Sequence, residues 1–156
     1  MVSTPQFSMR VSIVELSGAV ALAVLLAAAA PVETEYEVRV LQVWAGGDDP
    51  EKKPPQELKP HLDELRKRTG ETSFRLAART RSRTLKAGGS LALDLPSGYR
   101  AEWTVEEGGI RQTLTNPEKK QSSLLLKRSP VFTGLKKIRA DKATFQLIVE
   151  FHRREE

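Results

Sequence analysis

The chain contains no cysteine among its 156 residues. This absence excludes disulfides, thiolate zinc sites, cysteine nucleophiles and the lipidated cysteine of a lipoprotein. A domain without disulfides is held together by packing, and a chain of this length is sufficient to bury one core.

Histidine is scarce as well, since His61 and His152 are the only two and lie far apart. Neither has a second histidine four residues away, so metalloprotease spacing is absent, and both are interpreted as ordinary surface or boundary residues. A Gly-rich phosphate loop and a Gly-x-Ser-x-Gly elbow are also missing. Asp94 and Glu102 are expected to face each other across a hairpin, but on a wet face where both carboxylates stay ionised. We therefore predict that the protein is not an enzyme, has no catalytic or metal-binding residues and uses no cofactor.

Long hydrophobic runs are limited to one, VSIVELSGAVALAVLLAAAAPV at residues 11–32. From Leu16 to Ala30 it has fifteen residues without a charge, whereas a transmembrane helix needs about twenty. It ends in small residues, as a signal-peptide core does. The sequence therefore predicts a signal peptide or hydrophobic N-terminal helix over residues 1–30, in a periplasmic or secreted protein. The alternative is a protein anchored in the membrane by residues 11–30.

The start of this run, Val11-Ser12-Ile13-Val14-Glu15-Leu16, resembles the N-terminus of type IV pilins and pseudopilins. In that family a glutamate at the fifth mature position precedes a long apolar helix, and cleavage before Val11 would place Glu15 there. This chain has Arg10 where the family has a glycine, and Pro31 interrupts the run. The resemblance implies, as an alternative function, a pilin-like component of a secretion system.

Residues 31–156 are predicted to form a single β-rich domain. In ETEYEVRV, charged residues alternate with Thr34, Tyr36, Val38 and Val40, which is the period of a strand and predicts one over residues 34–44. A Gly- and Pro-rich loop follows over 45–54.

A helix is predicted over residues 55–69, with Leu58, Leu62 and Leu65 on one face and Gly70 at its C-terminal cap. Its narrow apolar stripe indicates a helix that covers a sheet.

Alternating segments separated by short Gly-bearing turns predict strands across residues 72–152. Leu93, Tyr99 and Trp103 are expected to point inward, and each strand is expected to have one buried and one wet face. The fold class is therefore α+β, with a mostly antiparallel sheet, as a meander or small sandwich, and one covering helix.

The layout of a strand, a Pro-rich loop, a helix and the segment that follows also resembles small secreted proteins of bacterial envelopes that have no assigned activity. The matching positions are Leu85, Gly88, Leu95, Pro96 and Gly98. The resemblance implies an exported fold and no particular chemistry.

Acidic residues are few between residues 65 and 142, where eighteen basic and seven acidic side chains occur. Four arginines, Arg75, Arg79, Arg81 and Arg83, share one face of a predicted strand, about 7 Å apart at each two-residue step. They are the candidate contacts for a polyanion. The alternative is that they keep an exposed sheet face soluble.

The partner expected from this pattern is an unknown protein or an anionic component of the envelope, with no small-molecule substrate. Nucleic acid is disfavoured because Tyr99 and Trp103 share the parity of core leucines and are not placed for base stacking. Membrane contact is expected only through the N-terminal segment, if it is retained. The predicted function is an exported, non-enzymatic binding or structural component of a bacterial cell envelope. The alternatives are the pilin-like component and a polyanion-binding protein that uses the arginine-rich strand face.

Overall fold

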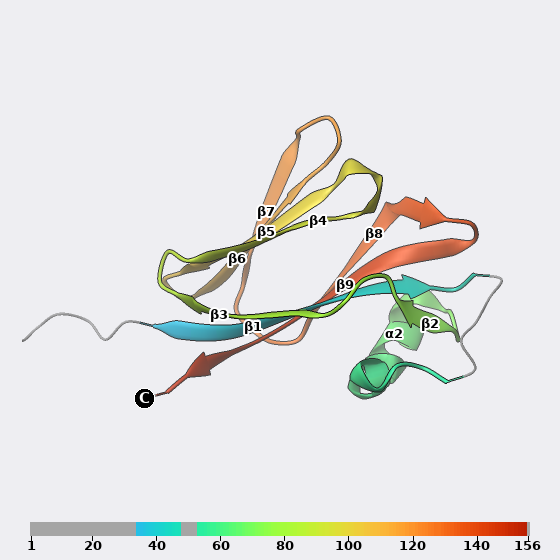
Figure 1. The fold of residues 1–156 in the computed structure, drawn as a ribbon, viewed down its shortest axis with the longest axis horizontal. Coiled ribbons are helices and arrows are strands. Elements are labelled where there is room, and N and C mark those ends of the chain that lie inside the picture. Colours follow the sequence, from blue (N-terminus) through green and yellow to red (C-terminus); the bar gives the residue numbers. More distant parts are fainter. Residues whose placement is uncertain (1–33, 48–52, 156) are drawn as a thin grey trace, which may run out of the picture. The chain divides into compact units, whose positions relative to one another are not determined.

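The computed structural model describes residues 34–47 and 53–155. These residues form two antiparallel sheets with a helical segment on the outer side of one of them (Figure 1). The expected α+β fold class, mostly antiparallel sheet with one covering helix, is confirmed. The predicted signal segment over residues 1–30, including the pilin-like residues 11–16, lies outside the described residues.

The first sheet contains five strands in the order β2-β1-β9-β8, with β3 also paired to β1. Residues 35–45 of β1 pair with β9 along their whole length, and β3 and then β2 occupy the opposite edge of β1. The strands are β1 (Glu35–Ala45), β2 (Phe74–Leu76), β3 (Arg81–Lys86), β8 (Val131–Ala140) and β9 (Ala143–Arg154).

The second sheet is a meander of four strands in the order β4-β5-β6-β7. A tight turn links it to the first sheet after β3, where the Gly89 N–H donates to Lys86 O at 2.8 Å. Between β4 and β5 the short 3-10 turn η2 (Pro96–Gly98) contains Ser97 at φ 62. The strands are β4 (Ser90–Asp94), β5 (Arg100–Glu106), β6 (Gly109–Thr115) and β7 (Gln121–Leu126).

The predicted helix over residues 55–69 consists of two helices of different type. The 3-10 helix η1 (Gln56–His61) precedes the α-helix α2 (Leu62–Thr69). Pro60 lies inside η1, and a proline there lacks the N–H that an α-helical bond requires. The predicted helical segment is thus found at residues 56–69, and its first half is of 3-10 type. The predicted cap is confirmed, because Gly70 has φ 72 and its N–H donates to Arg66 O at 2.8 Å.

Two cores flank the first sheet. Trp103, Ile110, Phe145 and other apolar residues fill the space between the sheets, on what we call their inner faces. On the helix face of the first sheet, Leu58 and Leu65 pack against a second cluster that includes Leu41 and other strand residues. The helix therefore covers a sheet, as its narrow stripe of leucines predicts.

Strand β9 departs from the expected pattern of one wet face. Phe145, Leu147 and Val149 are fully buried on the inner face, while Ile148 is fully buried under the helix and Gln146 is almost as covered. The middle of β9 is thus buried on both sides. The expectation of half-buried strands was wrong here because it ignored the helix as a second covering layer.

A chain of buried hydrogen bonds joins the two sheets across the inner core. Trp103 Nε1 in β5 donates to Gln112 Oε1 in β6 at 2.9 Å, and Gln112 Nε2 donates to Thr133 Oγ1 in β8 at 3.1 Å. Gln112 is 3% exposed, so its amide has replaced water contacts with these two partners. The bridge links the middle of the second sheet to the edge of the first.

Strand β8 was not singled out by its sequence. Its alternation is broken between Leu135 and Arg139, where the pairing with β9 shifts register. Three residues of β8, Lys136 to Ile138, lie between pairs whose partners are adjacent in β9, and this bulge breaks the period of two that identifies strands. Lys136 and Lys137 are exposed in the bulge, whereas Ile138 beside them is fully buried.

We predict that Trp103→Ala lowers the free energy of unfolding by about 3–5 kcal/mol, because the indole is fully buried and donates to Gln112. Leu93 is only half-buried, so Leu93→Ala is expected to cost less than Trp103→Ala. Asp94→Ala serves as the control and should cost less than about 0.5 kcal/mol, since its 3.3 Å contact with Arg100 is exposed. Urea unfolding of the three variants provides the measurement. A cost for Asp94→Ala equal to that for Trp103→Ala would contradict the assigned inner faces.

Candidate functional site

The four arginines of the sequence pattern do not lie on one continuous strand. Arg75 is in β2 and Arg81 and Arg83 are in β3, while Arg79 lies in the irregular segment between them. The break occurs where β1 changes its partner from β3 to β2. The structure therefore brings three of the four together along one edge of the first sheet and leaves Arg79 off its ladder.

These three arginines project from the inner face of the sheet, because directly paired residues on neighbouring strands share a face. Arg75 is opposite Trp44, Arg81 opposite Val40 and Arg83 opposite Val38. Val38 and Val40 belong to the core between the sheets, and Trp44 packs against it. The arginines were expected to project from the outer face of the sheet, and this expectation was wrong because they project from its inner face.

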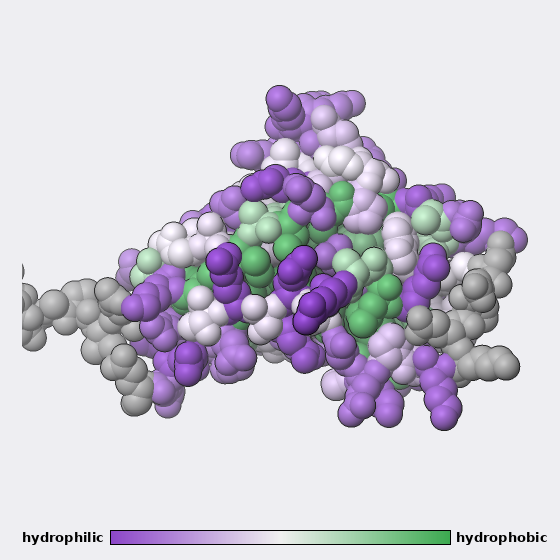
Figure 2. Space-filling model, viewed as in Figure 1, coloured by the Kyte–Doolittle hydropathy of each residue, from purple (hydrophilic) through white to green (hydrophobic). Residues whose placement is uncertain are grey.

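Arg81 and Arg83 are nevertheless exposed, and Arg75 is half-buried. Leu85, on the same face of β3, is buried beside the turn that leads into β4. From this turn β3 and β4 run apart (Figure 1), so β3 is covered only near its end. Hydrophilic side chains project over the course of β3 in Figure 2, with hydrophobic surface beside them. We call Arg75, Arg81 and Arg83 the arginine edge.

The arginine edge is not neutralised within the part of the chain that the structure describes. None of its three side chains forms an ion pair or a side-chain hydrogen bond with another described residue, and the same holds for Arg79. The edge therefore presents a local excess of positive charge to solvent, at which an anion can bind without first displacing a protein carboxylate.

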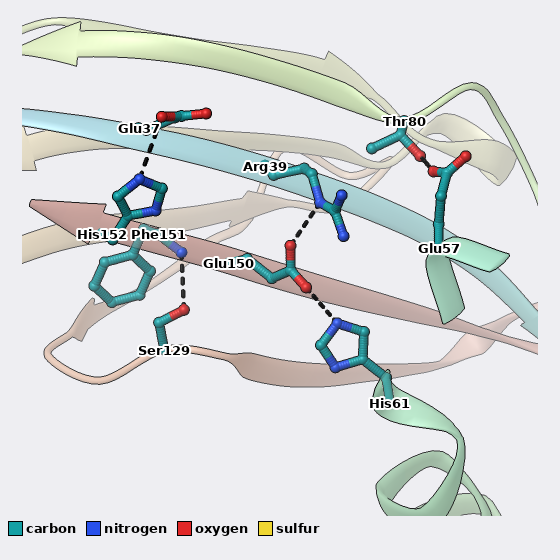
Figure 3. A network of polar contacts seen from close by, with 9 residues as sticks. All are labelled: Glu37, Arg39, Glu57, His61, Thr80, Ser129, Glu150, Phe151 and His152. Atoms are coloured by element: carbon teal, nitrogen blue, oxygen red, sulfur yellow. Dashed lines mark hydrogen bonds and ion pairs between the residues drawn. The ribbon is translucent and has the colours of Figure 1, made fainter. Parts of the chain in front are cut away.

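The opposite face of the same strands is different, because its charges form pairs across the strands (Figure 3). Glu37 contacts His152 at 3.2 Å, and the Arg39 guanidinium donates to Glu150 at 2.6 Å. Farther along, Lys86 lies 3.7 Å from Glu35. The alternating glutamates Glu35 and Glu37 of β1 thus have basic partners, Lys86 on β3 and His152 on β9.

Glu150 is also the partner of His61, whose Nε2 contacts the second carboxylate oxygen (Figure 3). His61 is 6% exposed, and its ring meets Phe132 edge-on with the centroids 5.6 Å apart. The interpretation of His61 as a surface or boundary residue was wrong, whereas His152 is exposed as expected. The cluster ties the end of η1 to the sheet.

Sequence reasoning missed this cluster because His61 and Glu150 are separated by 89 positions. The only signal was the place of His61 next to Leu58 and Leu62 on the helix. The Glu150 carboxylate accepts from the Arg39 guanidinium and contacts the His61 imidazole, so it links β1, β9 and the helical segment. The described contacts of the His61 ring are with Glu150 and Phe132, and we therefore assign it a structural role.

The acidic pair of the sequence pattern is not directly opposed. The register places Asp94 opposite Arg100 and Glu102 opposite Ala92. Among the described residues, no group of three or more histidine, cysteine, aspartate or glutamate side chains is arranged to hold a metal ion. No helix in the described part of the chain is long and apolar enough to cross a membrane.

A second basic surface lies at the β8 side of the domain. An open groove of about 350 Å³ is lined by Tyr99, Asn116, Leu135 and the bulge lysines Lys136 and Lys137, with Gly134 between them. Its walls are exposed or half-buried. The side chains of Lys136 and Lys137 form no ion pair with another described residue. The groove is therefore a second basic surface against which anion binding by the arginine edge can be compared.

No protein-family model, curated protein or solved structure matches this chain.

We predict that Glu150→Ala lowers the free energy of unfolding by about 1–3 kcal/mol, because Arg39 and buried His61 both lose their acceptor. Glu37→Ala is the matched control on the same face, since its partner His152 is exposed, and it should cost less than about 0.5 kcal/mol. Urea unfolding at constant pH measures both. Equal costs would show that the cluster contributes no more than a surface ion pair.

Proposed function

We propose that the protein is an exported, non-enzymatic component of a bacterial cell envelope that binds an anionic partner through the arginine edge. The single observation that carries this proposal is the contrast between the two faces of the β1–β3 region. Basic side chains on the helix face are paired with carboxylates, whereas Arg75, Arg81 and Arg83 on the inner face have no such partner among residues 34–47 and 53–155.

The choice of an anionic partner follows from this charge distribution. Like charges on neighbouring positions of one edge repel one another, and a bound polyanion removes that repulsion and releases its own counterions. The arginine guanidinium donates in a fixed fork that fits phosphate and carboxylate oxygens, so three arginines along one edge can contact several anionic groups at once. A partner bound in this way is expected to dissociate as salt is added.

The location of the protein is proposed from the sequence. The fifteen uncharged residues 16–30 have the length of a signal-peptide core, and the segment around Leu85–Gly98 resembles small exported envelope proteins. In an envelope the accessible polyanions are acidic lipid head groups, lipopolysaccharide and acidic proteins. The aromatic residues described beside the edge, Tyr36 and Trp44, are packed against the inner core, which supports these partners over nucleic acid.

We predict that the double variant Arg81→Thr, Arg83→Thr loses salt-sensitive retention on immobilised heparin and on vesicles with anionic lipids. Threonine preserves strand propensity at these exposed positions, so the melting temperature should remain nearly unchanged. The double variant Lys136→Thr, Lys137→Thr removes the same charge from the groove beside β8 and should retain binding.

Four outcomes are decisive. Loss of retention in the arginine variant alone supports the proposal. Equal loss in both variants means that only net charge matters, and loss in the lysine variant alone moves the contact to the groove. Failure of the unmodified protein to bind heparin and vesicles at low salt would leave the arginines with a solubilising role only.

A further inference from the structure

Strand β7 is the outer strand of the second sheet, and its sequence QSSLLL carries no charge and no proline. Both edges of the first sheet carry features that prevent pairing with another chain, namely charged side chains or a bulge. The arginines of β2 and β3 line one of them, and a bulge with two lysines interrupts β8 on the other. Strand β4, at the opposite edge of the second sheet, is short and ends in Asp94. Among the described strands, β7 is thus an edge without the charges, proline or bulge that prevent pairing.

The register identifies which backbone groups of β7 are available. The Asn116 N–H donates to Lys120 O at 3.0 Å, and the next pair along the ladder is Thr115 with Gln121. Because hydrogen-bonded and non-hydrogen-bonded pairs alternate in an antiparallel ladder, Ser122 and Leu124 bond to β6. The N–H and C=O groups of Gln121, Ser123 and Leu125 therefore point away from β6, toward the open edge.

An apolar anchor point lies beside this edge. Leu124 is 59% exposed and is the one large hydrophobic residue exposed in the described part of the chain. Next to it an open hollow of about 370 Å³ is lined by the three leucines of β7, by Pro130, Val131 and Phe132, and by the cations Arg68, Lys127 and Arg128. The Phe132 ring packs against the core under the helix, and the Arg68 guanidinium lies 5.0 Å from its centroid. The hollow has room for an apolar side chain of a partner.

Both ends of β7 are basic. Lys119 and Lys120 precede it, and Lys127 and Arg128 follow it; all four are exposed. The ion pair recorded for Lys120 is a 3.7 Å contact with exposed Glu118. If two copies of the chain paired through β7, cations would meet cations in either strand direction. The charges thus disfavour self-association and favour a segment with acidic residues on both sides of an apolar centre.

We propose that β7 is a docking edge that pairs with an extended, acidic segment of a partner protein. The partner's backbone bonds to the outward groups of Gln121, Ser123 and Leu125. One of its apolar side chains contacts Leu124 and enters the hollow, and its carboxylates meet the flanking cations. This mode is strand addition, in which the main chain contributes affinity and the side chains contribute selection. The surface is separate from the arginine edge.

The test uses the purified full chain and the synthetic peptide Asp-Glu-Val-Thr-Val-Glu-Asp as the probe, with fluorescence anisotropy as the readout. Ser123→Pro removes one outward N–H and leaves the bonds to β6 in place, which an edge strand tolerates. We expect it to weaken peptide binding about tenfold or more. Ser123→Ala is the matched control for the lost hydroxyl contact with Thr113 and should bind as the unmodified chain does.

A second variant keeps the proposal testable if Ser123→Pro does not fold. The double variant Lys127→Glu, Arg128→Glu should weaken binding of the acidic peptide and strengthen binding of the peptide Lys-Lys-Val-Thr-Val-Lys-Lys. Amide hydrogen exchange at Ser123 and Leu125 should also slow when the acidic peptide binds. The double variant Arg81→Thr, Arg83→Thr should leave peptide affinity unchanged.

Three results would overturn the proposal. They are undiminished binding by a folded Ser123→Pro variant, equal affinity of the unmodified chain for the acidic and basic peptides, and no binding of the acidic peptide at low salt. Weaker peptide binding in the Arg81→Thr, Arg83→Thr variant, with no effect of changes in β7, would assign the peptide to the arginine edge instead.

Discussion

The pairing of β1 with β9 is the contact on which the other elements of the domain depend. Eleven consecutive residue pairs join the two strands, from Glu35 with Arg154 to Ala45 with Thr144. On one side the pair is covered by the second sheet, and on the other by the helix. Removal of this ladder would leave both layers without the surface that they cover. Because its centre is buried on both faces, its backbone groups must be satisfied within the sheet, by each other and by β2, β3 and β8.

The same arrangement explains why contact surfaces lie at the edges. The centres of β1 and β9 have no free face, so the exposed charges of the first sheet lie toward the ends of these strands and on its outer strands. On the helix face the exposed charges pair and cancel, as Arg39 does with Glu150. At the arginine edge they do not cancel, and at β7 charge is absent from the strand and concentrated at its two ends. We interpret these two edges as surfaces with separate roles, one for an anion and one for an extended peptide.

Local patterns in the sequence were sufficient to predict much of the fold. The alternation through β1 and β5, the glycine after the helix and the leucines that face the sheet all depend on neighbours a few residues apart. The inner position of Trp103 followed from its parity with the leucines of β4. These features are fixed by periods of two and 3.6 residues, which a sequence displays directly.

The remaining features depend on contacts distant in sequence. The register shift in β8 conceals the period of two, and the burial of β9 on both faces requires knowledge of the helix above it. The arginines appeared to share one strand because nothing in Ala77–Thr80 marks a break, which arises where β1 changes partner. For the candidate site, the sequence identified the arginines but not the side of the sheet from which they project. It gave no indication that Glu150 joins Arg39 to His61.

Native-state amide hydrogen exchange tests the central role of the β1–β9 pair most directly. If the domain depends on this pair, the amides near Leu41 and Ile148, buried on the helix face, will exchange only through global unfolding. Their protection factors will be the highest in the domain. Outward amides of β7 should exchange fastest among the strands of the second sheet. Higher protection in β5 and β6 than in β1 and β9 would contradict the account, because the second sheet would then persist without the ladder on which it is proposed to depend.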